Sequence, residues 1–305
     1  MNHAFDFTAI IPTYNRRHVV GRAIDSVLAQ TYPCRAIIVI DDGSTDGTDE
    51  YLRRRYADVV TFRCLRQQNT GMGQARNNGV EAAATEWVAF LDSDDEWYQF
   101  RLQRIVEALE MHPDLDAVGV GMDIDSNSPL LQAPQGKPVV KLLSLERLLL
   151  QNGAVCWIVI RKRVFDAVGG FRFNFCEDHD LALRLVSRGY RLGFMPEPMG
   201  NIHTEESGQA LDHAEWCERL LQFWRAKLDK YGMRGIKNRE ALSSLYYDMS
   251  LGMMEKAQIG LSMRYLVSSL LQMPFPIKLI RYGRWQRHKR FAWMLLRGIH
   301  HFTES

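Results

Sequence analysis

The sequence contains little cysteine, and the cysteines it has form no metal-binding or redox motif. There are five in 305 residues, an odd number, and no two are spaced as Cys-x-x-Cys. This spacing argues against a disulfide framework and against a structural zinc site. We therefore expect reduced, mostly buried thiols, as in most cytosolic proteins.

Long apolar runs are also missing. The most apolar stretch, residues 259–277, is interrupted by Arg264, Gln272 and two prolines, so it falls short of the roughly 18 uninterrupted apolar residues of a membrane span. The first residues show no basic segment followed by a long apolar one, so no signal peptide is expected. The sequence predicts a cytoplasmic protein without a membrane span.

Two common nucleotide-binding motifs are absent as well. No Gly-x-x-x-x-Gly-Lys-Ser/Thr segment occurs, which excludes the ordinary P-loop ATPases and GTPases. The glycine-rich segment 71–76 lacks the third glycine of a dinucleotide site and follows the third expected strand rather than the first, so we do not expect NAD binding. Basic residues number 38 and acidic residues 36, and this near balance gives no case for a nucleic-acid partner.

Over residues 7–120, short apolar runs alternate with amphipathic segments. The apolar runs are residues 7–11, 36–40, 59–65, 87–91 and 117–120. Apolar residues between the first two runs recur at helical spacing, so we expect an α/β fold with a parallel sheet and crossover helices.

The remainder of the chain has a different character. Residues 121–157 carry loop signals, which predict a mobile loop that faces a partner. Beyond residue 208 the sequence shows only long helical patterns, at residues 214–231, 240–257 and 261–271. We therefore predict two domains, residues 1–208 and residues 209–305.

Polar side chains follow the expected strands at their carboxyl ends, where ligands bind in open α/β sheets. Asp92, Asp94 and Asp95 come directly after the fourth apolar run, and a divalent cation with a diphosphate is a usual way to neutralise such a cluster. Asp42 follows the second run and offers a carboxylate that can accept hydrogen bonds from a base or ribose. Tyr14 follows the first run and offers a ring on which a base can stack. Capped, solvated turns are the alternative interpretation of the acidic segments.

These segments together resemble the family 2 glycosyltransferases, which are inverting, nucleotide-sugar-dependent enzymes of the GT-A fold. The resemblance covers about residues 7–206. Its blocks in chain order are Ala9–Asn15, Ser26–Pro33, Asp41–Asp46, Asn69–Gly71, Ala75–Asn77, Phe90–Asp95 and Cys176–Leu181. It implies a Rossmann-like, mixed but mostly parallel sheet flanked by helices, to which the helical patterns beyond residue 208 add an α-helical C-terminal region.

The resemblance also implies roles for individual residues. Asp178 would be the catalytic base, and Asp94, Asp92 and His203 would hold Mn²⁺ or Mg²⁺. The residues implied to bind the nucleotide sugar are Pro12, Tyr14, Asn15, Asp42, Asn69, Arg76 and Asp92. A structural role for His203 and a helix-capping role for Asp178 remain as alternatives.

The implied reaction moves a single sugar from a nucleoside-diphosphate donor, UDP being the commonest carrier, to a hydroxyl of a glycan or lipid-linked acceptor. Cell-envelope or surface-polysaccharide biosynthesis is the expected setting. The processive members of this family carry a Gln-x-x-Arg-Trp motif, which this sequence lacks, so one sugar is expected per encounter. Two other hypotheses stay open: a nucleotidyltransferase that makes sugar nucleotides, and a non-catalytic nucleotide-sugar-binding protein.

The C-terminal segment 278–302 is basic and apolar at once. It holds seven lysines and arginines, no acidic residue, and interleaved tryptophans, leucines and phenylalanines. This pattern suits a helix that lies on an anionic membrane surface, which would make the protein peripheral at the inner membrane. A helix packed on the catalytic domain with a solvated basic face suits it equally.

Overall fold

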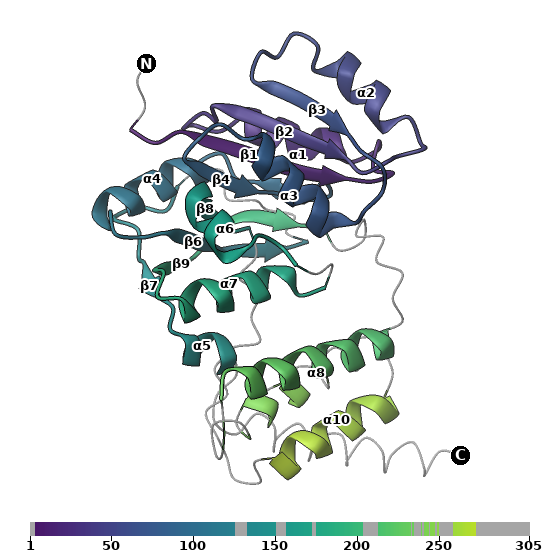
Figure 1. The fold of residues 1–305 in the computed structure, drawn as a ribbon, viewed down its shortest axis with the longest axis vertical. Coiled ribbons are helices and arrows are strands. Elements are labelled where there is room, and N and C mark those ends of the chain that lie inside the picture. Colours follow the sequence, from purple (N-terminus) through teal and green to yellow (C-terminus); the bar gives the residue numbers. More distant parts are fainter. Residues whose placement is uncertain are drawn as a thin grey trace. The chain divides into compact units, whose positions relative to one another are not determined.

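The computed structural model describes residues 4–125, 133–150, 157–172, 175–203, 213–232 and 259–272, with separate positions between 234 and 249. The chain divides into two compact units. The first comprises residues 1–144 and 154–208, and the second comprises residues 145–153 and 209–305. Figure 1 shows the strands of the first unit and the helices of the second.

The first unit is built on a nine-stranded sheet with the order β3-β2-β1-β4-β8-β6-β9-β5, in which β7 pairs with β9. The strands that carry the predicted nucleotide motifs are mutually parallel: β1 (Phe7–Thr13), β2 (Ala36–Asp41), β3 (Phe62–Arg66) and β4 (Trp87–Phe90). This half is fully buried along β1 and almost so along β2, as expected of parallel strands covered on both faces.

The other half of the sheet mixes directions. Strands β6 (Ala117–Ile124) and β9 (Leu192–Ile202) are parallel, and β8 (Val159–Arg161) is antiparallel to β4 and β6. The short strands β5 (Glu96–Trp97) and β7 (Lys141–Leu142) are antiparallel to β9. The mixed, mostly parallel sheet confirms the predicted fold class.

Helices connect the strands and cover the sheet (Figure 1). In chain order they are α1 (Val20–Leu28), α2 (Thr48–Arg55), α3 (Met72–Ala82), α4 (Arg101–Met111), α6 (Lys162–Val168) and α7 (Glu177–Ser187). The apolar stripe of α1 joins the core with Phe7, Ala9 and Ile11, one face of β1. Helix α3 packs on the other face, where a Cβ at Gly79 would lie 2.5 Å from Ile10 Cγ2. Glycine at this position lets α3 approach the sheet closely.

The register of the parallel strands brings their carboxyl ends to one edge. Thr13 pairs with Asp41 across β1 and β2, and Ile10 pairs with Phe90 across β1 and β4. The turns that follow β1, β2 and β4 therefore leave the sheet side by side. They carry the acidic and aromatic residues singled out in the sequence.

The second unit is helical in its described part. It contains α5 (Leu145–Leu150), α8 (His213–Lys230) and α10 (Ile259–Gln272). Reciprocal hydrogen bonds join the helical position Ser243 to α10, from Ser243 Oγ to Ser269 O at 2.9 Å and from Ser269 Oγ to Ser243 O at 2.6 Å. Within the described part of the chain, no helix is both long and apolar enough to cross a membrane. The basic segment 278–302 lies outside the described residues.

The region 121–157 differs from the expected loop in part. Strand β6 continues to Ile124, β7 occupies Lys141–Leu142, and α5 occupies Leu145–Leu150. The apolar side chains of Leu148 and Leu149 are buried, so proline-containing loop signals nearby did not prevent a short helix from forming.

Candidate active site

The Asp92–Asp95 turn begins directly after β4. Its backbone closes with a hydrogen bond from Asp95 N to Asp92 O at 3.2 Å. Two arginines meet Asp94: Arg22 of α1 donates to its main-chain oxygen, and Arg16 Nη2 lies 3.5 Å from Asp94 Oδ2. The turn is thus held by α1 and by the segment that precedes it.

Negative charge accumulates in this turn. Burial raises the pKa of Asp94, and the charge of Asp92 raises it further. Burial, together with Asp92 and Asp94, raises the pKa of Asp95 to about 8. The part of these rises that comes from neighbouring carboxylates reflects repulsion between like charges, which a nearby cation would relieve.

The donor chemistry of the turn fits a hard divalent cation. Carboxylate oxygens suit Mn²⁺ and Mg²⁺, and Mg²⁺ is often held by one or two protein carboxylates together with substrate phosphates. Among the described residues, no group of three or more His, Cys, Asp or Glu side chains is arranged to hold a metal ion. Asp94 and Asp92 can therefore supply only part of a coordination shell.

His203 lies beside this turn, at the end of β9. Its backbone N–H donates to Asp95 Oδ1 at 3.2 Å, and its Nε2 lies 3.3 Å from Glu96 Oε1. The ring therefore faces Glu96, a residue that the sequence did not single out. A metal-binding role for His203 stays a prediction.

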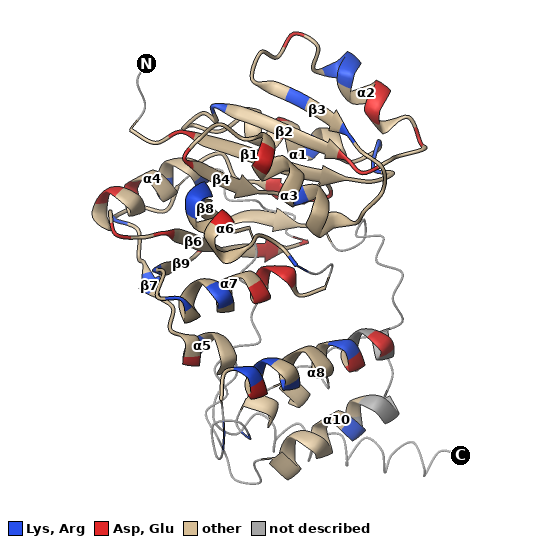
Figure 2. Ribbon diagram, in the orientation of Figure 1, with Lys and Arg blue, Asp and Glu red and all other residues tan. Residues whose placement is uncertain are grey.

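Three acidic residues lie in the first turn of α7, as Figure 2 shows at the start of that helix. Glu177 Oε1 accepts from Arg76 Nη1 at 2.6 Å, and Asp180 Oδ2 accepts from Arg184 Nε at 2.7 Å. Asp178 makes no hydrogen bond or ion pair of this kind with the described residues. Among the acidic residues of this turn, Asp178 is thus the one without a hydrogen-bonded arginine in the described part of the chain, although the charge of Arg76 still acts on it.

Electrostatics at Asp178 favour proton uptake near neutral pH. Burial raises its pKa to about 7, against the lowering influence of Arg76, while Glu177 and Asp92 add to the rise. For Arg76 itself, burial alone would lower the pKa, but Asp92, Asp178 and Glu177 raise it, so the guanidinium stays charged. A carboxylate with a pKa near the working pH suits a general base.

The predicted nucleotide-binding residues divide into two groups. Tyr14, which is 47% exposed, and Asn69, which is also exposed, are accessible to a ligand. Pro12 is buried within β1. The Asn15 side chain ties two turns together, because its Oδ1 accepts from Thr45 N at 2.8 Å.

Asp42 orders the loop that leads into α3. Its Oδ1 accepts from Gln67 Nε2 at 2.7 Å and from Thr70 N at 2.9 Å, and its Oδ2 accepts from Gly71 N at 2.8 Å. Both carboxylate oxygens are therefore engaged within the protein. Contact of Asp42 with a ribose stays a prediction.

Two polar atoms at the strand ends belong to residues that the sequence motifs included but to which no individual role was assigned. Asp41 Oδ2 and Thr13 Oγ1 are buried and have no hydrogen-bond partner in the described part of the chain. They belong to residues paired across β1 and β2, and Arg66 Nε lies 3.8 Å from Asp41 Oδ2, beyond hydrogen-bond distance. Such atoms cost about 1–3 kcal/mol each when left unpaired, so a ligand that reached them would recover that free energy.

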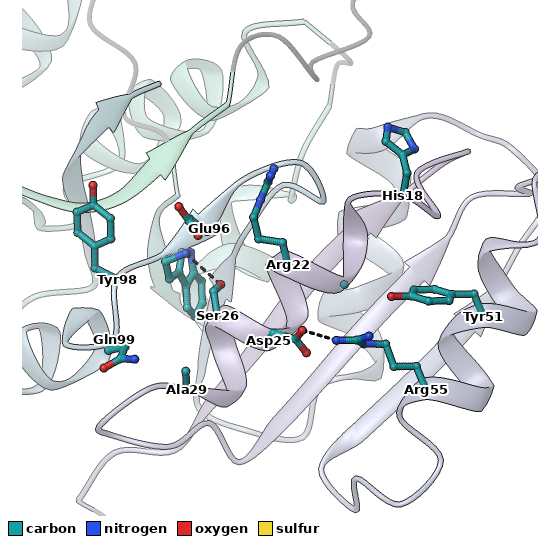
Figure 3. A pocket seen from close by; sticks show the side chains of 12 residues that line it. His18, Arg22, Asp25, Ser26, Ala29, Tyr51, Arg55, Glu96, Tyr98 and Gln99 are labelled. Carbon is teal, nitrogen blue, oxygen red and sulfur yellow. Dashed lines mark hydrogen bonds and ion pairs between the residues drawn. The ribbon is translucent and has the colours of Figure 1, made fainter. Parts of the chain in front are cut away.

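A separate pocket of about 480 Å³ lies along the outer face of α1. Asp25 and Arg55 form an ion pair on its wall, with Asp25 Oδ2 2.7 Å from Arg55 Nη2 (Figure 3). Arg22 and Glu96 line the same pocket and also contact the Asp92–Asp95 turn and His203. The pocket therefore adjoins the acidic turn, although no sequence motif marked it.

The model of the family described as "Glycosyl transferase family 2" matches residues 8–180. The chain belongs to this family. The predicted family is thus confirmed, and the match includes the strand ends, the acidic turn and Asp178.

Individual proteins are similar over different lengths. The "Amylovoran biosynthesis glycosyltransferase AmsB" of Erwinia amylovora is 27% identical over 210 residues, 65% of this chain and 69% of that one. Three other curated relatives are 30–42% identical to this chain in the matched part. That part covers only 36% of the length of each of these relatives.

Two solved structures share the GT-A fold. Staphylococcus aureus TarS 1–349 in complex with UDP-GlcNAc has a TM-score of 0.61 at 18% identity, covering 87% of this chain and 81% of the 1–349 chain. The mannosyltransferase PcManGT from Pyrobaculum calidifontis, in complex with GDP-Man and Mn²⁺, has a TM-score of 0.58 at 20% identity, covering 88% of this chain and 76% of the other.

Proposed function

We propose that the chain is an inverting, metal-dependent glycosyltransferase that moves one sugar from a nucleoside-diphosphate sugar to an acceptor hydroxyl. The observation that carries the proposal concerns the side-chain partners and the pKa of Asp178. Its neighbours Glu177 and Asp180 are each paired with a buried arginine, whereas Asp178 has no such partner among the described residues and a raised pKa. Inverting transfer needs one such carboxylate.

In this mechanism Asp178 accepts the proton of the acceptor hydroxyl as that oxygen attacks the anomeric carbon. The acidic turn lies on the other side of Arg76, whose Nη2 is 2.5 Å from Asp92 Oδ1. Asp94, with Asp92, would hold the metal ion. A bound Mn²⁺ or Mg²⁺ would stabilise the charge that develops on the leaving diphosphate.

UDP is the proposed carrier. Asp41 Oδ2 accepts no hydrogen bond from the described residues, and it would accept one from the ring N–H of uracil. TarS, which shares the fold, binds UDP-GlcNAc. The exposed Tyr14 ring supports the proposal because it offers a surface on which a base could stack.

The proposed acceptor is a glycan or a lipid-linked glycan of the cell envelope or cell surface. The name of the Erwinia amylovora relative, which refers to amylovoran biosynthesis, supports this setting. We place the protein in the cytoplasm, with peripheral contact at the inner membrane through segment 278–302. That contact rests on the sequence alone.

The test is to identify the product released from labelled nucleotides with Mn²⁺ present. Release of free UDP from a UDP-sugar supports transfer. Release of pyrophosphate from a nucleoside triphosphate would instead indicate a nucleotidyltransferase. Binding of a nucleotide sugar without turnover, across donors and with simple sugar acceptors, would indicate a binding protein.

A further inference from the structure

Arg76 of α3 contacts two carboxylates that lie far from each other in the sequence. Its Nη1 donates to Glu177 Oε1 at 2.6 Å, and its Nη2 donates to Asp92 Oδ1 at 2.5 Å. Arg76 is 2% exposed and Glu177 is 7% exposed, so solvent screens this ion pair little. One buried guanidinium therefore joins the turn after β4 to the first turn of α7.

A second set of contacts from α3 holds the segment that precedes α7. Asn77 Nδ2 donates to Phe171 O, and Asn77 Oδ1 accepts from Phe171 N, both at 2.9 Å. The Phe171 ring lies against the Arg76 guanidinium, 5.3 Å from Cζ to the ring centroid. Gly170, with φ +56°, leaves room for these contacts, because a Cβ there would lie 2.7 Å from Asn77 Oδ1.

The backbone at the start of α7 is strained. Cys176, immediately before the helix, has φ +50°, a left-handed conformation that costs free energy in a residue other than glycine. Glu177 is the next residue, and its side chain is bonded to Arg76. The ion pair therefore holds the residue that directly precedes Asp178 in the first turn of α7.

We propose that Arg76 and Glu177 form a positioning pair that holds Asp178 in place relative to the Asp92–Asp95 turn. In this pair Glu177 is an anchor and does not accept the substrate proton. The inference rests on the proposed function, since it concerns how the base of that reaction is held. It also gives Arg76 a role other than the nucleotide contact implied by the family resemblance.

Two substitutions at position 177 distinguish a residue that only positions Asp178 from a residue that accepts the substrate proton. Glutamine keeps an oxygen that can accept from Arg76, whereas methionine is of similar length and offers only a weakly accepting sulfur. We expect Glu177→Gln to lower kcat by less than about tenfold, because a neutral acceptor still bonds the guanidinium. We expect Glu177→Met to lower kcat by about 100-fold, the effect of a misplaced catalytic group, with the KM for donor changed by less than about twofold.

The assay measures nucleoside diphosphate released by the full chain with Mn²⁺, using the most active of UDP-glucose, UDP-N-acetylglucosamine and GDP-mannose. Glu197→Met is the matched control, because Glu197 Oε1 accepts from the buried Arg104 Nη2 at 2.9 Å, an α4–β9 contact not used in the proposed mechanism. We expect this control to lower the unfolding temperature while kcat stays within about twofold of wild type.

A double variant tests whether the two residues act as a unit. Arg76→Met with Glu177→Met should lose no more kcat than Arg76→Met alone, because the second change removes a contact that is already broken. Losses that multiply would overturn the pair. So would a Glu177→Gln variant as inactive as Glu177→Met, which is the result expected of a general base.

The outcomes remain decisive if a variant does not fold. Should Glu177→Met be unfolded by circular dichroism, Glu177→Gln is compared with Asp178→Asn, the same chemical change one residue along. If Arg76 and Glu177 only position Asp178, Glu177→Gln keeps most of kcat and Asp178→Asn loses it. An equal loss of kcat in both variants overturns the proposal. A wild-type protein that releases no nucleoside diphosphate overturns the proposed function and the pair together, whereas failure in an active protein overturns the pair alone.

Discussion

Arg16 Nη2 lies 3.5 Å from Asp94 Oδ2, so the carboxylate proposed to hold the metal ion already faces a cation. Both side chains are largely buried, at 20% and 16% exposure. The charge of Arg16 lowers the pKa of Asp94, while burial and Asp92 raise it by more. A divalent ion would therefore neutralise the negative charge that Arg16 neutralises only in part.

Removal of the Asp94 carboxylate should abolish the effect of metal on donor binding. Asp94→Ala is expected to bind UDP-sugar with the same affinity with and without Mn²⁺, whereas the wild type binds it more tightly with Mn²⁺. Isothermal titration calorimetry measures both affinities, with Asp25→Asn as a control because Asp25 pairs with Arg55 and lies outside the acidic turn. A Mn²⁺ dependence that persists in Asp94→Ala would refute the assignment.

The rate of transfer should depend on pH through Asp178. Burial raises its pKa to about 7, and only the deprotonated carboxylate can accept a proton. Below that pH, kcat/KM should fall by about tenfold per pH unit, and above it kcat/KM should level off. Rates measured from pH 5 to 9 check this, and a profile that is flat between pH 5 and 7 would contradict the base assignment.

The choice of nucleobase should change when Asp41 is neutralised. Asp41→Asn keeps an oxygen for the bond from Ser44 N, 3.0 Å from Asp41 Oδ1, and replaces Oδ2 with an NH₂ donor. We expect the affinity for UDP to fall by about tenfold or more, because the base N–H would face another donor, while the affinity for CDP falls less. An unchanged ratio of the two dissociation constants would show that Asp41 does not contact the base.

Segment 278–302 should carry any contact with a membrane. The full chain is expected to pellet with liposomes that contain anionic lipid, at low salt more than at high salt, because each basic residue near the surface contributes about 1 kcal/mol. A chain without residues 278–305 should stay in the supernatant. Equal pelleting of the two proteins, or none by either, would favour a helix packed on the catalytic domain.

Local patterns predicted the parallel half of the sheet well. The runs that became β1, β2 and β4 are fully or almost fully buried, so their apolar character is continuous and their ends are clear. The turns at those ends also follow from the sequence, since the acidic turn begins right after β4. The α/β class was predicted correctly from these patterns, and the family and its GT-A fold from the resemblance of the motif blocks.

In the other half of the sheet, the sequence predicted the start of β6 through the apolar run 117–120, but it did not predict β5, β7, β8 or β9. Strand β9 contains Pro196 and Pro198, which read as loop signals, and its pairing with β6 accommodates them through register shifts. Strands β5 and β7 are two residues long, too short for any periodic pattern. Their existence depends on β9 as a partner, which is a tertiary effect.

Contacts between distant residues could not be predicted from local patterns. Arg76 and Glu177 are separated by 101 positions, and no local pattern indicates that they meet. Asp42 was predicted at the nucleotide because it follows a strand, but its carboxylate also orders residues 67–71, a consequence of how α3 packs beside β2. Side-chain pairing of this kind is set by the assembled fold.

The most direct test of the account compares wild type with Asp178→Asn in two measurements on the same samples. One is the release of UDP from a UDP-sugar with Mn²⁺, and the other is the affinity for that UDP-sugar by calorimetry. We predict that the variant loses about 10²- to 10⁴-fold in rate while its affinity stays within about threefold, because the amide keeps the shape but cannot take the proton. A variant that keeps more than about half of the wild-type rate would contradict the account, because another group would then be the base.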